Sequence, residues 1–364
     1  MTPGLLKLAL LLIAACHLSA QAVDRNQRPK TPNGKHGNGL IPATGLAYVD
    51  RPDAMALADD IAEQFQLDKK WVRNAIGRAR FMPEVVRLVI PPPTTTPKNW
   101  QRYRNNAIDP VRIQAGVKFW QQNRATLARA EARYGVPAQI IVGILGVETL
   151  YGQQMGNFRA MDALATLAFD FPATHPRAQA RGAFFKSELG HLLSLKRNPS
   201  IDPLKARSSY AGALGMPQFM PSSWVRYAVD FDGDGRIDLY SSPADIIGSV
   251  AYYFKSFNWQ PGMPTHYPVS FDPEMLEMDA LLAPDILPSF SVDTFTYKGA
   301  LLEGPGRDHK GPLALVKLQN GNAEPSYVAG TENFYVITRY NWSSFYALGV
   351  IELGEAVATA MKKP

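Results

Sequence analysis

One glutamate of this 364-residue chain stands in a strongly apolar helical segment, where a carboxyl group can take part in proton transfer. Residues 137–151 are predicted to form a helix, and Glu148 shares a face of it with Ile141 and Leu145. Apolar neighbours and the negative end of the helix both favour the neutral carboxyl, which raises the expected pKa of Glu148 toward about 6. Such a glutamate can act as a general acid near neutral pH. The pattern leaves a second interpretation open, in which Glu148 points to solvent or pairs with an arginine.

A second segment, residues 208–224, combines small residues and glycines with aromatic and hydrogen-bonding side chains. Glycine lets a backbone approach a ligand closely, and Ser209, Gln218 and the nearby aromatic rings are groups that bind sugars. On its own, the segment is equally consistent with a tightly packed loop.

A cluster of acidic residues at positions 230–238 has the D-x-D-x-D-G spacing of an EF-hand calcium loop. Its position 12 is Ser241, where a calcium sensor carries a bidentate glutamate. Carboxylates this close repel one another unless a hard cation lies between them, so the sequence predicts a structural calcium ion. The alternative is a solvated, aspartate-rich turn. The expected ligands within the loop are the carboxylates of Asp230, Asp232 and Asp234 and the backbone carbonyl of Arg236.

Composition excludes several classes of protein. With 46% hydrophobic residues the chain can bury a core, which excludes a disordered or fibrous protein. The net charge of +6 favours anionic partners, but lysine and arginine form no basic tract, so no nucleic-acid partner is expected. A single cysteine excludes an intrachain disulfide and a cysteine-rich metal site, and the six histidines show no HExxH spacing.

The N-terminal residues 1–22 have the pattern of an export signal, in which Lys7 precedes an apolar run too short to span a bilayer. The only cysteine, Cys16, follows an aliphatic residue and two alanines and resembles the lipidation site of bacterial lipoproteins. His17 in place of aspartate favours, by the same resemblance, the outer membrane. Ordinary cleavage after residue 22 is the alternative. Residues 23–45 are predicted to be a flexible tether.

The elements that carry these groups are mainly helical. Helices are predicted over residues 52–80 (with Asp53 as cap), from Asp109 to Gly135, over 137–151 and over about 343–361, and a loop at 91–97. The alternating apolar residues at 290–297 and the runs at 314–318 and 335–338 are predicted strands. The sequence therefore indicates an α+β fold in which helices dominate.

Three motifs in order give the chain a family resemblance. Gly-Val-Glu-Thr-x-Tyr-Gly (residues 146–152), Ser-Tyr-Ala-Gly-Ala-x-Gly-x-x-Gln-Phe-Met-Pro-Ser-Ser (209–223) and Thr-Arg-Tyr-Asn (338–341) resemble the B-type membrane-bound lytic murein transglycosylases, glycoside hydrolase family 103. The resemblance covers about residues 45–360. It implies a lysozyme-like core at 136–265 with the calcium loop at 230–245, a helical subdomain at 46–135 that later segments can join, a small β-containing region at 266–340, and a C-terminal helix at 341–364 that returns to the core.

The resemblance also implies an activity, which is non-hydrolytic cleavage of the β-1,4 bond between MurNAc and GlcNAc in peptidoglycan. It makes Glu148 the single catalytic acid and base, and Asp245 the residue that closes the calcium site, although the loop here is one residue longer. The expected partners are glycan strands and, through a lipid anchor, the inner leaflet of the outer membrane; we expect a periplasmic monomer. The positions that match the glycan groove of the family are Tyr103, Ser209, Gln218, Tyr340, Asn341 and Tyr346.

Two rival interpretations stay open at this stage. Ordinary glycosidases use two carboxylates, and Asp170 is the nearby acid in apolar company, although a turn or capping role suits it better. Glu148 with Asp170 would make a hydrolytic muramidase. The second rival is a calcium-stabilised, wall-binding lipoprotein in which Glu148 is only structural.

Overall fold

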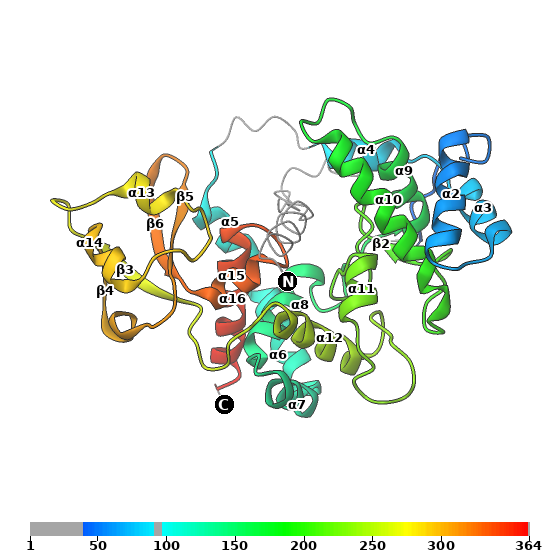
Figure 1. Cartoon of the computed structure of the whole chain (residues 1–364). Helices are drawn as coiled ribbons and strands as arrows, with labels where there is room; N and C mark the ends of the chain where they lie inside the picture. Colours follow the sequence, from blue (N-terminus) through cyan, green and yellow to red (C-terminus); the bar gives the residue numbers. More distant parts are fainter. Residues whose placement is uncertain (1–38, 91–96, 363–364) are drawn as a thin grey trace, which may run out of the picture. The chain divides into compact units, whose positions relative to one another are not determined.

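The computed structural model describes residues 39–90 and 97–362, which form two compact units assembled from separated stretches of the chain. Unit 1 contains residues 97–147 and 251–362, and unit 2 contains residues 39–90 and 148–250. Each unit is described by itself, with the labels of Figure 1. Cys16, the predicted export signal and the first part of the tether lie outside the described residues.

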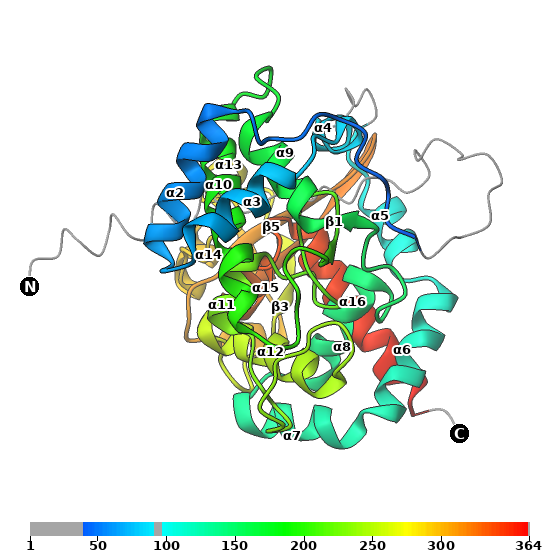
Figure 2. The ribbon, with the colours of Figure 1, turned by 90° about the vertical axis from the view of Figure 1, so that its right-hand side faces the viewer.

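Unit 2 is helical apart from one short strand pair. Its elements are α2 (Pro52–Gln64), α3 (Lys69–Arg78), α4 (Pro83–Val89), β1 (Phe158–Arg159), α9 (Ala160–Phe169), α10 (Ala178–Ser194), η2 (Leu195–Arg197), β2 (Arg207–Ser208) and α11 (Pro221–Tyr227). β1 and β2 pair antiparallel. Nearly every residue of α9 is buried, and α10 packs along it, as Figure 2 shows.

Unit 1 combines helices with an antiparallel sheet. Its elements are α5 (Trp100–Ala107), α6 (Pro110–Gln122), α7 (Arg124–Tyr134), β3 (His266–Phe271), α13 (Met278–Leu282), α14 (Val292–Tyr297), β4 (Ala300–Leu302), η3 (Gly304–Asp308), β5 (Ala314–Asn320), β6 (Ala323–Gly330), α15 (Glu332–Thr338) and α16 (Ser344–Ala360). Two further helices, α8 (Ala138–Thr149) and α12 (Pro243–Ser256), continue along the chain from one unit into the other.

Two of the predicted helices are interrupted. The segment 52–80 is broken into α2 and α3 because Gln66 adopts a positive φ of 52° and Asp68 caps α3 by accepting the Trp71 N–H at 2.7 Å. The residue before α2 is Arg51, so Asp53 lies in the first turn and is not the cap. The helix predicted from 109 to 135 is likewise divided, at Asn123, and it ends at Gly135 as expected.

The sheet of unit 1 has the strand order β4-β3-β6-β5, with all neighbours antiparallel. α13 and α14 pack on its strands, and the shared core contains Tyr267, Leu281, Phe295 and Leu315. The strand predicted at 314–318 is confirmed as β5. The strands predicted at 290–297 and 335–338 are wrong, because residues 292–297 form α14 and residues 332–338 form α15.

Polar caps explain both errors. The Ser291 side chain accepts the N–H of Thr294, and the Thr331 side chain accepts the N–H of Asn333, each at 3.2 Å. A serine or threonine in this position satisfies a free N–H of a first helical turn and starts a helix in a short apolar run. The mainly helical α+β class is nevertheless confirmed. No helix within residues 39–90 and 97–362 is long and apolar enough to cross a membrane.

In unit 1, α16 packs so closely on the helix that leads to Glu148 that side chains are excluded from two positions. A Cβ atom at Gly143 would lie 2.2 Å from the Val350 carbonyl oxygen, and one at Gly354 would lie 2.1 Å from that of Gln139. α16, red in Figure 2, also runs beside α6. The first half of α8 is therefore in close backbone contact with α16 at Gln139 and Gly143.

We predict that Gly354→Ala destabilises the protein by about 1–3 kcal/mol, because the added methyl group has no space without moving backbone. Gly182→Ala in α10 is the matched control: its Cβ would meet only the Ala168 carbonyl oxygen, at 3.8 Å. That change should stabilise the helix by up to about 1 kcal/mol. Urea unfolding curves of both variants test this, and equal midpoints would contradict the close packing of α8 on α16.

Candidate functional site

Glu148 is the next-to-last residue of α8 and the first residue of unit 2. Its side chain is half-buried, whereas Thr149, which follows it, is completely buried. The helix is apolar on nearly all sides up to this point, as the sequence predicts. The carboxyl group of Glu148 therefore stands where a rigid, buried helix ends.

The turn after Glu148 has an unusual backbone. Leu150, Tyr151 and Gly152 all have positive φ angles, of 50°, 53° and 88°. Each non-glycine residue in this region costs about 1–3 kcal/mol, so surrounding contacts must hold the turn. The Thr149 hydroxyl supplies two of them: it donates to the Met216 carbonyl at 2.9 Å and accepts the Gly152 N–H at 3.0 Å.

Met216 belongs to the loop that carries the second motif. Gln218 also has a positive φ, 54°, and its side-chain nitrogen donates to the Gly215 carbonyl at 2.9 Å. The Ser209 hydroxyl accepts the N–H groups of Ala213 at 3.1 Å and Ala211 at 3.3 Å. Unit 2 thus places Ser209 and Gln218 in one organised loop, and Thr149 joins this loop to the end of α8.

A buried carboxylate, Glu188 of α10, holds the far end of the same loop. It is 2% exposed and accepts both the backbone N–H of Ser222 at 2.9 Å and the Ser222 hydroxyl at 2.6 Å. Burial raises the pKa of Glu188, although the two hydrogen bonds from Ser222 act in the opposite direction. Sequence reasoning missed this residue; the apolar residues on either side, Phe185 and Leu189, were the available signal.

The four remaining groove candidates lie in unit 1, around the start of α16. Tyr103 packs against Trp100 and Phe345, with ring centroids 5.9 and 5.8 Å apart. Tyr340 stacks on Tyr346 at 6.5 Å, and Tyr346 is 4% exposed. Asn341, the neighbour of Tyr340, is 8% exposed. The structure therefore gathers Tyr103, Tyr340, Asn341 and Tyr346 within unit 1, and Glu148, Ser209 and Gln218 within unit 2.

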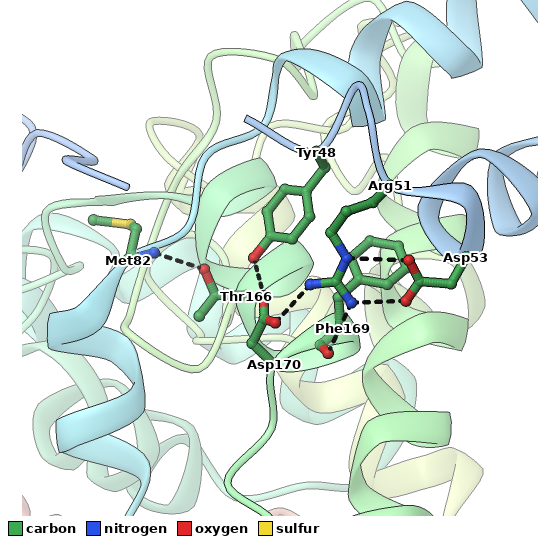
Figure 3. Close-up of polar contacts among 7 residues, drawn as sticks. All are labelled: Tyr48, Arg51, Asp53, Met82, Thr166, Phe169 and Asp170. Atoms are coloured by element: carbon green, nitrogen blue, oxygen red, sulfur yellow. Dashed lines mark hydrogen bonds and ion pairs between the residues drawn. The ribbon is translucent and has the colours of Figure 1, made fainter. Parts of the chain in front are cut away.

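Asp170, the proposed second carboxylate, is engaged on both oxygens (Figure 3). It accepts a hydrogen bond from the Tyr48 hydroxyl at 2.6 Å and pairs with Nη1 of Arg51 at 2.6 Å. Arg51 also binds Asp53 at 2.7 Å. Burial, and next the hydrogen bond to Asp170, raise the pKa of Tyr48 far above the usual tyrosine value. Asp170 thus anchors the segment around Tyr48 to the end of α9.

The acidic loop brings three carboxylates together. Oxygen atoms of Asp230, Asp232 and Asp234 all lie within 4.8 Å of one another. Although desolvation acts to raise it, backbone N–H groups of Gly235, Gly233 and Asp234 keep the pKa of Asp230 below its usual value. Charged oxygens in such a group fit a hard cation. The backbone N–H of Arg236 donates to Asp234 at 2.8 Å.

Asp245 lies at the base of this loop, in the first turn of α12, and is 1% exposed. Its two oxygens accept the N–H groups of Phe231 and Asp238, both at 2.8 Å. Burial, together with the negative charges of Asp232 and Asp230, raises the pKa of Asp245. The side chain thus fastens both ends of the loop to α12.

Most of the chain matches a known protein family. Residues 50–355 match the family described as Transglycosylase SLT domain. The chain is 37% identical to membrane-bound lytic murein transglycosylase B of Escherichia coli K12, over 96% of this chain and 95% of that protein.

Solved structures agree in fold. The E. coli lytic transglycosylase Slt35 in complex with calcium has a TM-score of 0.74 at 37% identity, covering 88% of this chain and 97% of that one. SltB3 of Pseudomonas aeruginosa in complex with NAG-anhNAM-pentapeptide has a TM-score of 0.69 at 28% identity, covering 83% and 79%.

The pH dependence of stability should report on Glu188. Because its folded pKa is raised, the neutral form stabilises the fold; this contribution is complete below the ordinary value of 4.5 and is lost as the pH rises through the folded pKa. As the pH rises above 4.5, the free energy of unfolding should therefore fall more steeply for the wild type than for Glu188→Gln. Glu63→Gln, at an exposed position of α2, should follow the wild type. Parallel curves for wild type and Glu188→Gln would contradict this.

Proposed function

Because the chain belongs to the Transglycosylase SLT domain family and is a lytic transglycosylase that acts on peptidoglycan, we propose that Glu148 is its single catalytic acid and base. The observation that carries this proposal is the position of Glu148, which ends a buried helix and is followed by a turn fastened to the Gln218 loop through Thr149. The backbone is thus held both before and after Glu148, which restricts the positions that its carboxyl group can take toward a bound glycan.

The proposed reaction uses a nucleophile that the substrate already carries. Glu148 donates its proton to the bridging oxygen, and the bond from that oxygen to C1 of MurNAc breaks. The N-acetyl group stabilises C1 from the opposite face. The ionised Glu148 then takes the proton of the C6 hydroxyl as this oxygen attacks C1, which gives 1,6-anhydroMurNAc and consumes no water. Holding both reacting groups on one ring supplies up to about 7–11 kcal/mol of proximity advantage.

Two observations support a mechanism with one carboxylate. The oxygens of Asp170 are engaged by Tyr48 and Arg51, which suits an anchoring role and not the activation of water. Glu188, likewise, is engaged by Ser222 on both oxygens. In addition, the relative SltB3 is solved with a ligand that contains an anhydro sugar, the product type expected of this reaction.

We propose that the groove candidates of each unit, taken separately, bind sugar residues of the glycan. In unit 2, Gln218 and Ser209 stand in the loop that Thr149 joins to the end of α8, and the hydrogen bond from the Gln218 amide nitrogen to the Gly215 carbonyl orients that amide. In unit 1, Asn341 supplies a further amide, and the rings of Tyr103 and Tyr340 supply apolar faces for sugar rings. Tyr346, which is 4% exposed, stacks on Tyr340 and would complete this group.

We further propose a structural calcium ion in the acidic loop, as in the calcium complex of Slt35. Asp230, Asp232 and Asp234 converge and would hold the ion together with the Arg236 carbonyl. A carboxylate has about four lone-pair sites, so Asp245 retains acceptor capacity beyond its two N–H bonds and would close the site. The ion supplies charge compensation there and no step of the reaction.

The sequence supports a location outside the cytoplasm. We propose that Cys16 is lipidated and holds a monomeric enzyme at the periplasmic face of the outer membrane, where peptidoglycan lies. The relative in E. coli is named as membrane-bound.

Glu148→Gln should slow the release of soluble fragments from purified murein by about a hundredfold to ten-thousandfold, because it removes general acid–base catalysis. Retention on insoluble murein should be unchanged. The wild-type products should be lighter by one water than those of lysozyme. Asp170→Asn, with its fold checked by circular dichroism, is the discriminating control: it should keep its turnover. Hydrated products that depend on Asp170 would establish the muramidase instead.

Adding calcium to protein treated with a chelator should raise the thermal midpoint, since a ligand at 100 times its Kd stabilises by about 2.7 kcal/mol. Asp230→Asn and Asp234→Asn should abolish the increase, because each removes a charged ligand. Asp202→Asn, an exposed aspartate of the same unit, should respond as the wild type does. An unchanged midpoint with calcium would show that the loop is a solvated turn.

A further inference from the structure

Unit 2 contains a pocket of about 600 Å³ that shares no lining residue with the site described above. The segment 43–49, near the start of the described chain, forms one side of it, and α3 forms another. Its polar and charged lining consists of Arg73, Asn74, Arg78, Arg80, Arg159 and Asp162.

The charges of this arginine pocket are unbalanced. Asp162 is 4% exposed and accepts hydrogen bonds from the Arg159 Nε at 2.7 Å and from the backbone N–H of Arg80 at 2.8 Å. Arg73 is paired with Asp59 at 2.8 Å. Within the part of the chain that the structure describes, Arg78 and Arg80 have no ion pair. Asp59 and Asp162 thus neutralise Arg73 and Arg159, and the charges of Arg78 and Arg80 remain for a ligand with several anionic oxygens, such as a phosphate.

Exposed apolar side chains occur in the segment 43–49, which lines the same pocket, and just before it in the sequence. Ten large apolar residues are exposed in the described chain, and four of them fall within ten positions: Leu40, Ile41, Leu46 and Val49. Leu46 is 86% exposed, and Val49, 55% exposed, lines the pocket itself. A soluble anion or the carboxylate of a peptide would account for the arginines but not for these side chains. Guanidinium groups beside exposed aliphatic residues fit the phosphate layer and the acyl boundary of a lipid leaflet.

We propose that the arginine pocket binds the phosphate headgroup of an anionic membrane lipid while Leu46 and its apolar neighbours enter the interface. The geometry of this contact rests on the proposed lipid anchor at Cys16. The 23 residues that follow Cys16 end at Gly39, and they span at most roughly 80 Å when fully extended. The anchor therefore keeps the pocket within reach of one leaflet, and the contact would hold unit 2 at that surface.

The test uses the chain that begins at Val23, which lacks the lipid and contains every described residue. Its co-sedimentation is measured with vesicles of phosphatidylethanolamine and phosphatidylglycerol, and with vesicles of phosphatidylcholine alone. We expect binding to the anionic vesicles, weakened about fivefold by Arg78→Gln and by Arg80→Gln and further by Leu46→Ser. The matched controls are Arg226→Gln and Val225→Ser, an exposed arginine and valine of the same unit, which should bind as the wild type does. Release of fragments from purified murein should be unchanged in all five variants.

Several outcomes would overturn the proposal. One is an active protein that ignores anionic vesicles, and another is binding that does not respond to Arg78, Arg80 or Leu46. If glycerol phosphate binds through the same arginines and vesicles do not, the pocket takes a free anion. If the variants lose affinity for intact murein instead, the pocket binds the wall polymer and not a lipid. Because this chain lacks Cys16, the result does not depend on lipidation, and because activity is followed separately, it does not depend on the assignment of Glu148.

Discussion

The proposed catalytic arrangement depends on one hydroxyl group, that of Thr149. The chain reverses directly after Glu148 through three residues of positive φ, a path that costs free energy and that an isolated helix end would not adopt. The buried Thr149 side chain makes this path stable because it donates to Met216 and accepts from Gly152 at the same time. The same bond joins the end of α8 to the loop of Gln218. A carboxyl group on a rigid helix and an amide on a separate loop thereby become parts of one framework.

Carboxylates in this protein differ in role because their environments differ. Asp170 pairs with Arg51 and accepts a hydrogen bond from the Tyr48 hydroxyl, and it thereby holds the segment around these residues on α9. Burial raises the pKa of Glu188 although Ser222 donates two hydrogen bonds to it, so its contribution to stability depends on pH. Asp230 receives backbone N–H groups at the surface, so its charge persists beside two further carboxylates. Both carboxylate oxygens of Asp170 and of Glu188 accept hydrogen bonds within the fold, which suits a structural role. This distinguishes them from Glu148, the proposed catalytic residue.

Sequence patterns predicted the long, apolar elements well. The helix at 137–151 and the helix at 343–361 each bury most of their surface, so composition and length alone indicate them. The short elements were predicted wrongly because single capping residues determine them. Ser291 and Thr331 start helices in apolar runs whose alternation is typical of strands. The family motifs singled out Glu148 from the sequence. No local pattern indicates the pair Glu188–Ser222, whose members are 34 positions apart, or the pair Asp170–Tyr48, which are 122 positions apart.

The acidic loop is connected at its far end to the loop of Gln218, so the proposed calcium ion would act on that loop through the backbone. Asp245 fastens residues 231 and 238 to α12, and the chain that leaves the loop then bonds to the second motif. The Leu239 carbonyl accepts the Met216 N–H at 2.8 Å, and a Cβ atom at Gly215 would lie 2.4 Å from the same oxygen. Met216 is also the residue that Thr149 holds. A cation that orders the loop therefore restricts Leu239, and through Met216 it restricts both Gln218 and the turn after Glu148, without touching a reacting atom.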